Sequence, residues 1–199
     1  MITSGTALRL PLKRLIALCR KYSVPVFVDG AHAIGNVPVD LQDLAPDFFV
    51  TNCHKHLCTP KGVAILYVDE KYTHQIHPLS TSHSWLFGFW SEFSWTGTQD
   101  WSAYLSVVSA IRFFVSHDIN TIMKRNQQLA REAGLYLARL WQTRMFVSSE
   151  NLLANMALVQ LPSTNREENA VSAKKCHDIL WKEFKIEAIF LHKMLSHLD

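Results

Sequence analysis

The sequence predicts an α/β protein, because short apolar runs of strand length alternate with amphipathic segments of helix length. Residues 24–28, 47–51 and 63–68 are the three strand-like runs in the first part of the chain. The first is continuously apolar, as in a strand with both faces buried, and we therefore expect a largely covered sheet. Residues 12–19 repeat apolar side chains at helical spacing, and Pro11 suits the first turn of that helix.

The middle of the chain is predicted to be irregular at first and helical afterwards. Residues 72–98 are rich in His, Ser, Thr and Trp and show no helical period. Asp100 is a suitable N-cap for an apolar helix over residues 101–115. A polar break at 116–118 separates that helix from a longer amphipathic one. The apolar face of this second helix comprises Leu129, Ala133, Tyr136, Leu137 and Leu140.

The last part of the chain is predicted to contain a second set of α and β elements. A strand over residues 156–161, a helix over 173–184 and a strand over 186–190 follow in that order. We expect this set to begin a smaller α+β domain. The predicted organisation is a first domain over residues 1–118, followed by a linking helix and a partial small domain over 119–199.

Composition excludes several classes of protein. The chain has 199 residues, of which 48% are hydrophobic and 19% charged, which excludes a disordered or low-complexity polypeptide. The 20 Lys and Arg and 17 Asp and Glu are scattered, unlike the clustered basic surface of a nucleic-acid-binding protein. No secretory signal or membrane span is recognisable. Four cysteines are too few for a disulfide scaffold, so we predict a reduced, cytoplasmic protein.

Asp29 is the first candidate functional residue. It follows a predicted buried strand, and open α/β sheets build their ligand sites at the carboxyl ends of strands. A buried ionised carboxylate in such a place needs a cationic or hydrogen-bonding partner. The alternative is an ordinary turn residue before Gly30, and from the sequence alone the two interpretations are about equally good.

Lys55 is the second candidate, in the polar stretch 52–56 that follows the next predicted strand. A lysine between two imidazoles and near Lys61 has cationic neighbours, which favour the neutral, nucleophilic form of its amine. The alternative is a solvated loop lysine. An acid and a Schiff-base lysine at one end of a sheet are together what pyridoxal phosphate requires of a protein.

Four motifs in this order resemble class V aminotransferases: residues 29–35 (DGAHAIG), 54–55 (HK), 60–62 (PKG) and 95–100 (WTGTQD). The pattern is most similar to the isopenicillin N epimerase-like proteins, with cysteine desulfurases more distant, and it covers residues 2–120. The resemblance implies a fold type I protein. Residues 1–118 would be the C-terminal part of its large domain, a mainly parallel sheet covered by helices. It also implies a partial chain, without the N-terminal half and the C-terminal end.

The resemblance also implies roles for residues around the cofactor ring. Lys55 would form the Schiff base with the aldehyde of pyridoxal 5'-phosphate and later carry the α-proton of the substrate. Asp29 would pair with the protonated ring nitrogen and keep the ring an electron sink. His32 stands where the family places a Gln or His that hydrogen-bonds the ring hydroxyl oxygen.

Three further residues match the family's phosphate-binding positions. Asn52, where relatives often have Ser, and His54 would contact the cofactor phosphate. Thr98 would reach the phosphate of the partner subunit across a homodimer. Its place before a predicted helix N-terminus also suits an anion on electrostatic grounds.

The function predicted in this way is a pyridoxal-phosphate-dependent enzyme acting on an amino acid or related amine. Epimerisation, amino transfer and elimination all stay open. A truncated, non-catalytic chain that only binds partners is the alternative. A zinc site within residues 53–58 is disfavoured, because four ligands within six residues do not readily surround one tetrahedral ion. Cys176 falls on a predicted amphipathic helix face, where packing is a better interpretation than a desulfurase nucleophile.

Overall fold

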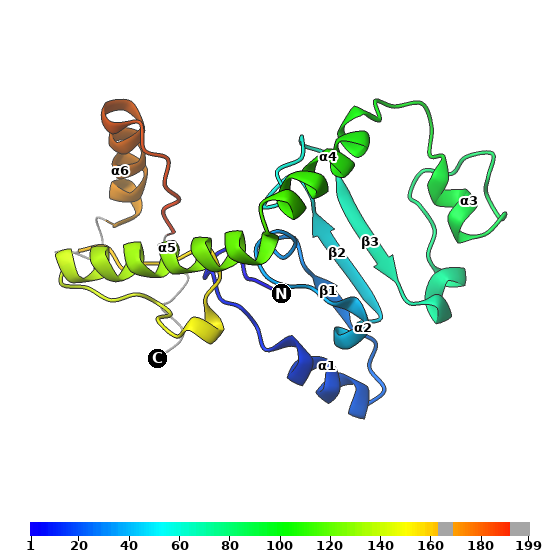
Figure 1. Ribbon diagram of the computed structural model, residues 1–199, viewed down its shortest axis with the longest axis horizontal. Helices are drawn as coiled ribbons and strands as arrows, with labels where there is room; N and C mark the ends of the chain where they lie inside the picture. The colour runs from blue at the N-terminus through cyan, green and yellow to red at the C-terminus, as the bar shows by residue number, and fades with distance from the viewer. Residues whose placement is uncertain (163–168, 192–199) are drawn as a thin grey trace.

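The computed structural model describes residues 1–162 and 169–191, without the side chains of residues 169–173, and its centre is a three-stranded sheet (Figure 1). The strands are β1 (Phe27–Asp29), β2 (Phe48–Asn52) and β3 (Ala64–Val68), in the order β1-β2-β3. The predicted α/β class is confirmed. Among the described residues the sheet is mixed, because β1 is parallel to β2 whereas β3 is antiparallel to it. The connection between β2 and β3 is too short for the crossover that a parallel pair needs.

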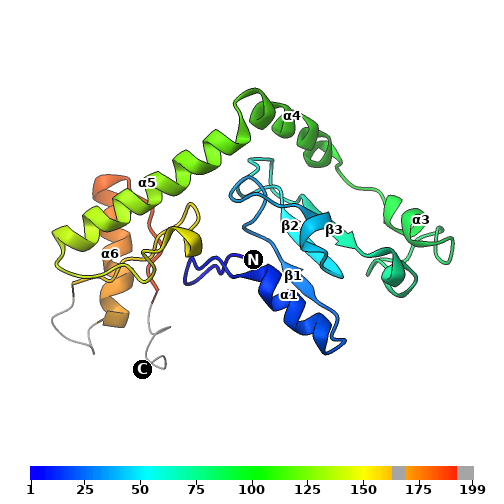
Figure 2. The same cartoon turned by 60° about the horizontal axis from the view of Figure 1, so that its bottom comes forward.

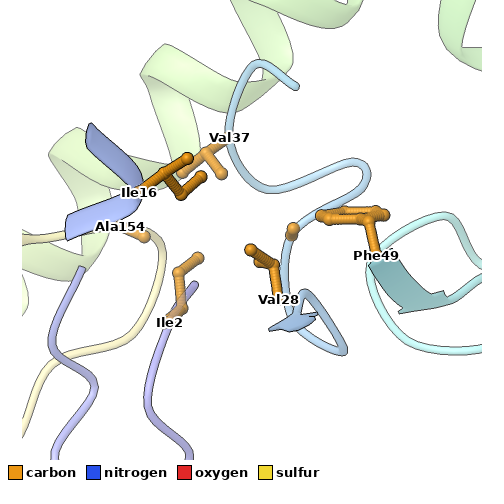
Figure 3. Packing of buried hydrophobic residues seen from close by; sticks show 7 residues of the cluster. Ile2, Ile16, Val28, Val37, Phe49 and Ala154 are labelled. Atoms are coloured by element: carbon orange, nitrogen blue, oxygen red, sulfur yellow. The ribbon is translucent and has the colours of Figure 1, made fainter. Parts of the chain in front are cut away.

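One face of the sheet is covered by α1 (Leu12–Lys21) and by loops around it. Val28 of β1, Phe49 of β2 and Ile16 of α1 belong there to one buried cluster, which Figure 3 draws. Ile2, near the start of the chain, and Ala154, in the segment that follows the long helix α5 (Ile119–Leu140), complete the same cluster. The segment after the long helix α5 is therefore part of the core beside the sheet.

A second cluster fixes the loop that leaves β2. Leu57 and Val63 are almost completely buried there, and they pack against Phe114 of α4 (Ser102–Ser116). Burying side chains of this size contributes about 1.5–3 kcal/mol each. Apolar contacts of Leu57 and Val63 thus hold the loop between β2 and β3 in place.

The other face of the sheet is not covered within the described part of the chain. Phe27 of β1 is 59% exposed and Leu66 of β3 is 41% exposed. An open hollow of about 340 Å³ on this face is lined by Pro25, Phe27, Phe48, Leu66, Val68 and Ile76. The prediction that the first strand is buried on both faces is therefore wrong, because the described chain supplies a covering layer for one face only.

Helix starts in the first part of the chain follow the expected capping chemistry. Asp40 caps α2 (Leu41–Leu44) by accepting hydrogen bonds from two backbone amides of its first turn. Helix α4 begins one residue later than predicted, so Asp100 precedes the N-cap residue Trp101. The Oδ1 of Asp100 still accepts hydrogen bonds from the backbone N–H and the hydroxyl of Ser102. The segment predicted to be irregular contains a 3₁₀ helix at Glu70–Gln75 and α3 at Phe89–Ser94.

The long helix α5 (Ile119–Leu140) begins at the predicted break, where Asp118 is its N-cap. Its buried face differs from the prediction. Leu129, Tyr136 and Leu140 are more than half exposed, whereas Gly134 is buried. A Cβ atom at Gly134 would lie 2.9 Å from the Cε of Met145, so the glycine lets the following segment approach closely. At Gly134, small size and not hydrophobicity allows the close packing.

Elements after residue 140 agree only in part with the prediction. The predicted helix is present as α6 (Asn169–Phe184), but Cys176 on it is exposed, so its assignment to packing was wrong. Residues 156–161 and 186–190 form no strand. Between Met145 and Val159 there is a single bridge, because no further strand in the described chain offers a hydrogen-bonded edge. The domain boundary after residue 118 stays a prediction.

No helix within residues 1–162 and 169–191 has the length and apolar character needed to cross a membrane.

A short 3₁₀ helix at Glu150–Leu152 lies in the segment between α5 and α6. Figure 2 shows α5 leading from the end of α4 to this segment and to α6.

Asp47 links the start of β2 to two other segments. Its Oδ2 accepts a hydrogen bond from the backbone N–H of Val26 at 2.8 Å, and its Oδ1 pairs with Lys71 Nζ at 2.5 Å. Burial acts to raise the pKa of Asp47, but the hydrogen bonds from Lys71 and Val26 outweigh burial and hold that pKa below its ordinary value. A lowered carboxyl pKa stabilises the fold above the unfolded-state pKa, and this contribution is lost as the pH falls through the folded-state value.

We therefore expect Asp47→Asn to lower the free energy of unfolding at pH 7 by about 1–2 kcal/mol, because a hydrogen bond to a charged group is lost. Below about pH 4, where the unfolded carboxyl protonates, the variant should lose less stability than the unaltered protein. Urea unfolding between pH 2 and pH 7 measures both effects. Asp43→Asn is the control, since its ion pair with Lys13 is exposed and contributes little. Equal acid sensitivity of Asp47→Asn and the unaltered protein would contradict this account.

Candidate active site

Lys55 lies in the turn that directly follows β2. The backbone N–H of Cys53 donates to Val63 O at 3.0 Å, and the N–H of Thr59 donates to Cys53 O at 3.2 Å. These two bonds close the loop at its base, and the buried Leu57 holds it down. Lys55 is therefore carried on a short, anchored turn at the carboxyl end of β2.

Asp29 is the last residue of β1 and lies at the same edge of the sheet, because β1 and β2 are parallel neighbours. Its side chain is exposed, and Oδ1 accepts a hydrogen bond from the N–H of Ala31 at 2.9 Å. Gly30 continues the pairing by donating to Val50 O at 2.7 Å, and its carbonyl accepts from the hydroxyl of Thr51 at 2.7 Å. The carboxylate is thus fixed in place at the mouth of the sheet.

The turn after β1 and the lysine turn after β2 meet at Gly35. Its φ is +77°, and a Cβ atom there would lie 2.3 Å from the carbonyl oxygen of His56. Only glycine accommodates this conformation and this close approach together. The contact places His32, three residues before Gly35, against the Lys55 turn.

His32 connects the two turns through its ring. Its Nε2 lies 3.1 Å from Lys55 Nζ, and its Nδ1 lies 3.3 Å from His56 Nε2. Burial lowers the pKa of His32, the charge of Lys55 lowers it further, and Asp29 opposes both. Burial also lowers the pKa of His56, with contributions from His32 and Lys55. Both imidazoles are therefore neutral near pH 7.

Two asparagines extend this group, and sequence analysis missed both. Asn36 donates from Nδ2 to the carbonyl of His32 at 3.0 Å, and its Oδ1 accepts from the backbone N–H of Asn155 at 3.0 Å. Asn155 Nδ2 lies 3.1 Å from His56 Nδ1. Asn155 is 119 residues from Asn36 in the chain, and no local pattern marks it. His56 was noticed only as a neighbour of Lys55.

The amino-terminal ammonium of Met1 also lies at this edge, where it donates a hydrogen bond to the backbone carbonyl of Asp29. Burial lowers the pKa of this ammonium, whereas the Asp29 carboxylate acts to raise it. The side chain of Asp29 is exposed, so the burial that the sequence analysis considered for this carboxylate is not found.

The other predicted site residues are placed as follows. Asn52 is the last residue of β2 and pairs with Ala64 of β3. The Nδ1 of His54 is 3.1 Å from Val63 O, which leaves Nε2 on the outer side of the ring. Thr98 is exposed in the segment that joins α3 to α4, and in the part of the chain that the structure describes no hydrogen bond links it to the Lys55 group. The structure therefore brings Asp29, His32 and Lys55 together and leaves Thr98 outside that group.

Cysteines and histidines of residues 53–58 do not converge. Cys53 is buried, Cys58 is exposed, and His56 faces His32. Across the described residues, no group of three or more His, Cys, Asp or Glu side chains is placed to hold a metal ion. The chemistry of this edge is that of an amine, a carboxylate and two neutral imidazoles.

An amine and a carboxylate thus lie at the carboxyl ends of two neighbouring parallel strands, the edge at which open α/β sheets build their ligand sites. Solved structures similar to this chain have the fold called type I. A cysteine desulfurase from Thermococcus onnurineus superposes with a TM-score of 0.70 at 15% identity, covering 89% of this chain and 46% of that one. An alanine–glyoxylate aminotransferase from Nostoc sp. superposes with a TM-score of 0.71 at 17% identity, covering 92% and 49%.

The sequence profile of the family described as Aminotransferase class-V matches residues 3–174. The chain belongs to the class V aminotransferase family, whose cofactor is pyridoxal 5'-phosphate.

Curated relatives of this chain are named for cysteine chemistry. A putative L-cysteine desulfhydrase 1 from Oryza sativa subsp. japonica is 36% identical over 94% of this chain and 39% of its own length. An L-cysteine desulfhydrase from Arabidopsis thaliana is 33% identical over 87% of this chain and 39% of its own length. The chain spans about two fifths of the length of these relatives. Another Arabidopsis relative is named as chloroplastic, and the cytoplasmic location and the likeness to isopenicillin N epimerase stay predictions.

The residues at this edge fit the cofactor of the family. Pyridoxal phosphate needs an amine for its aldehyde and an acid for its ring nitrogen. Lys55 and the exposed carboxylate of Asp29 are close enough to His32 that both act on its pKa. The bond from Ala31 occupies Oδ1 of Asp29, and Oδ2 remains for a ring nitrogen. Gly30, where a Cβ atom would lie 2.5 Å from the Phe49 ring, keeps the strand end free of a side chain.

Proposed function

We propose that this chain carries the lysine, the acid and the imidazole of a pyridoxal-phosphate-dependent enzyme that acts on an amino acid. The observation that supports this most is the placement of Lys55 and Asp29 at one edge of the sheet with His32 next to the lysine amine. Among the reactions left open by the sequence, lyase chemistry on L-cysteine is favoured, because the curated relatives carry that name.

Each residue would have a distinct task. Lys55 supplies the amine that holds the cofactor through its aldehyde carbon, and it takes the α-proton of the substrate onto Nζ. Asp29 pairs with the ring nitrogen and keeps it protonated. The bound ring supplies an electron sink for the charge left when that proton departs. His32 orients the amine of Lys55 through the contact at its Nε2.

The phosphate group would be held by Asn52 at the end of β2, by His54 in the turn that follows, and by Thr98 of a second copy of the chain. This part of the proposal rests on the match to the family motifs, and it requires a homodimer. Sedimentation of the protein with cofactor measures the oligomeric state. A strictly monomeric profile with full cofactor binding would remove Thr98 from the site.

The proposal is tested by locating the covalent attachment in the unaltered protein. The protein is mixed with pyridoxal phosphate, reduced with borohydride, digested and examined by mass spectrometry. We expect the adduct on Lys55 and not on Lys61, which is exposed in the next turn. Sulfide release from L-cysteine then tests the substrate. A protein with no adduct, or with adducts spread over surface lysines, would favour the alternative of a non-catalytic chain that binds partners.

A further inference from the structure

Four side chains at the candidate site form an unbroken series of close polar contacts that ends far from the lysine in sequence. The series runs from Lys55 Nζ to His32 Nε2 at 3.1 Å, and from His32 Nδ1 to His56 Nε2 at 3.3 Å. It continues from His56 Nδ1 to Asn155 Nδ2 at 3.1 Å. The two rings thus contact each other through one nitrogen each and a different neighbour through the other.

Neutral imidazole has one donor nitrogen and one acceptor nitrogen, so a hydrogen on one ring decides where the hydrogen lies on the next. When Lys55 accepts, Nε2 of His32 carries a hydrogen, and its Nδ1 must accept from Nε2 of His56. When Lys55 donates, the hydrogens of both rings lie on Nδ1. In each self-consistent arrangement the two rings therefore have the same tautomer.

Asn155 is suited to the far end of this series, because a carboxamide offers a donor at one atom and an acceptor at the other. Its Nδ2 contacts His56, while its Oδ1 is buried and has no hydrogen-bond partner among the described residues. Rotation of the amide by half a turn would present Oδ1 to His56 instead. The backbone of Asn155 is held meanwhile by Asn36, which also holds the backbone of His32.

We propose that His56 and Asn155 are positioning residues for Lys55, acting through His32, and that the hydrogen positions on the two rings are coupled along this series. When Lys55 is charged and donates to His32, the amide of Asn155 accepts from His56. When Lys55 is uncharged and accepts from His32, the amide donates to His56. The consequence for the reaction rests on the proposed function above, whereas the coupling itself is a property of the chain without cofactor.

The test measures the tautomers of His32 and His56 from the nitrogen chemical shifts of their rings, near neutral pH and without cofactor. We expect the same single tautomer for both rings. Asn155→Leu should change His32 to a mixture of tautomers, although Asn155 does not touch it. Lys55→Met should likewise change the tautomer of His56. Asn151→Leu, an exposed asparagine of the same segment, is the matched control and should change neither ring.

Opposite tautomers in the unaltered protein would overturn the coupling, and so would a His32 signal that is unchanged in Asn155→Leu. If Asn155→Leu does not fold, the response of His56 to Lys55→Met decides the question. The positioning role has its own readout: the rate of borohydride-trapped attachment at Lys55 should fall about tenfold in His56→Phe. An unchanged rate would overturn that role. An unaltered protein that forms no adduct would count against the proposed function and leave the tautomer result standing.

Discussion

Lys55→Ala should abolish covalent cofactor attachment completely, with no visible absorption from bound cofactor and no adduct after borohydride. The reason is chemical, because the alanine side chain has no amine to bind an aldehyde. The effect on the fold should be small, since Lys55 is only half-buried and its turn is held by backbone hydrogen bonds and by Leu57. Absorption spectra, mass spectrometry and urea unfolding measure the three quantities.

Lys61→Ala is the matched control for that loss. Lys61 is exposed and lies in the same connection between β2 and β3, and its replacement by alanine removes the same charge. It should retain the absorption and the adduct. Equal loss in both variants would show that attachment depends on the general charge of the loop, and Lys55 would then lose its place as the site lysine.

Gly35→Ala should destabilise the fold by about 3 kcal/mol or more, since a strained left-handed conformation and an overpacked contact each cost about 1–3 kcal/mol. The added Cβ would lie 2.3 Å from the carbonyl oxygen and 2.7 Å from the carbonyl carbon of His56. Backbone atoms cannot move aside as a flexible side chain does, so the lysine turn must shift. We expect urea unfolding at a lower concentration and slower attachment of cofactor at Lys55.

Gly62→Ala separates the two causes. Gly62 also has a positive φ, +99°, but a Cβ atom there would meet nothing within 4 Å. This variant should carry only the conformational strain, about 1–2 kcal/mol, and should leave attachment at Lys55 unchanged. A Gly35 variant no less stable than the Gly62 variant would mean that the contact between the two turns is not tight.

The convergence of Asp29 and Lys55 could be predicted from the sequence, because each residue ends or directly follows a recognisable strand. Parallel neighbours bring such ends to one edge, and β1 and β2 are parallel. The roles of these residues toward the cofactor are not tested by that geometry and stay proposals. His56 and Asn155 could not be predicted, since their contact joins residues 99 positions apart with no local pattern.

The wrong predictions for the later part of the chain have a common physical cause. Periodicity identifies an apolar segment, but a strand also needs a hydrogen-bonded neighbour, which residues 156–161 and 186–190 lack among the described residues. The buried face of α5 was wrong for a related reason. Gly134 allows the neighbouring segment to approach the helix closely, and a search for hydrophobic residues at helical spacing does not identify a glycine as part of the packed face.

The sheet face that the described residues leave uncovered has a practical consequence for handling this polypeptide. The side chains of Phe27, Phe48 and Leu66 line an open apolar hollow, and exposing this apolar surface to water is unfavourable in free energy. Contiguous patches of this kind promote adhesion between molecules. We therefore expect molecules to associate through this face at high protein concentration, which light scattering measures.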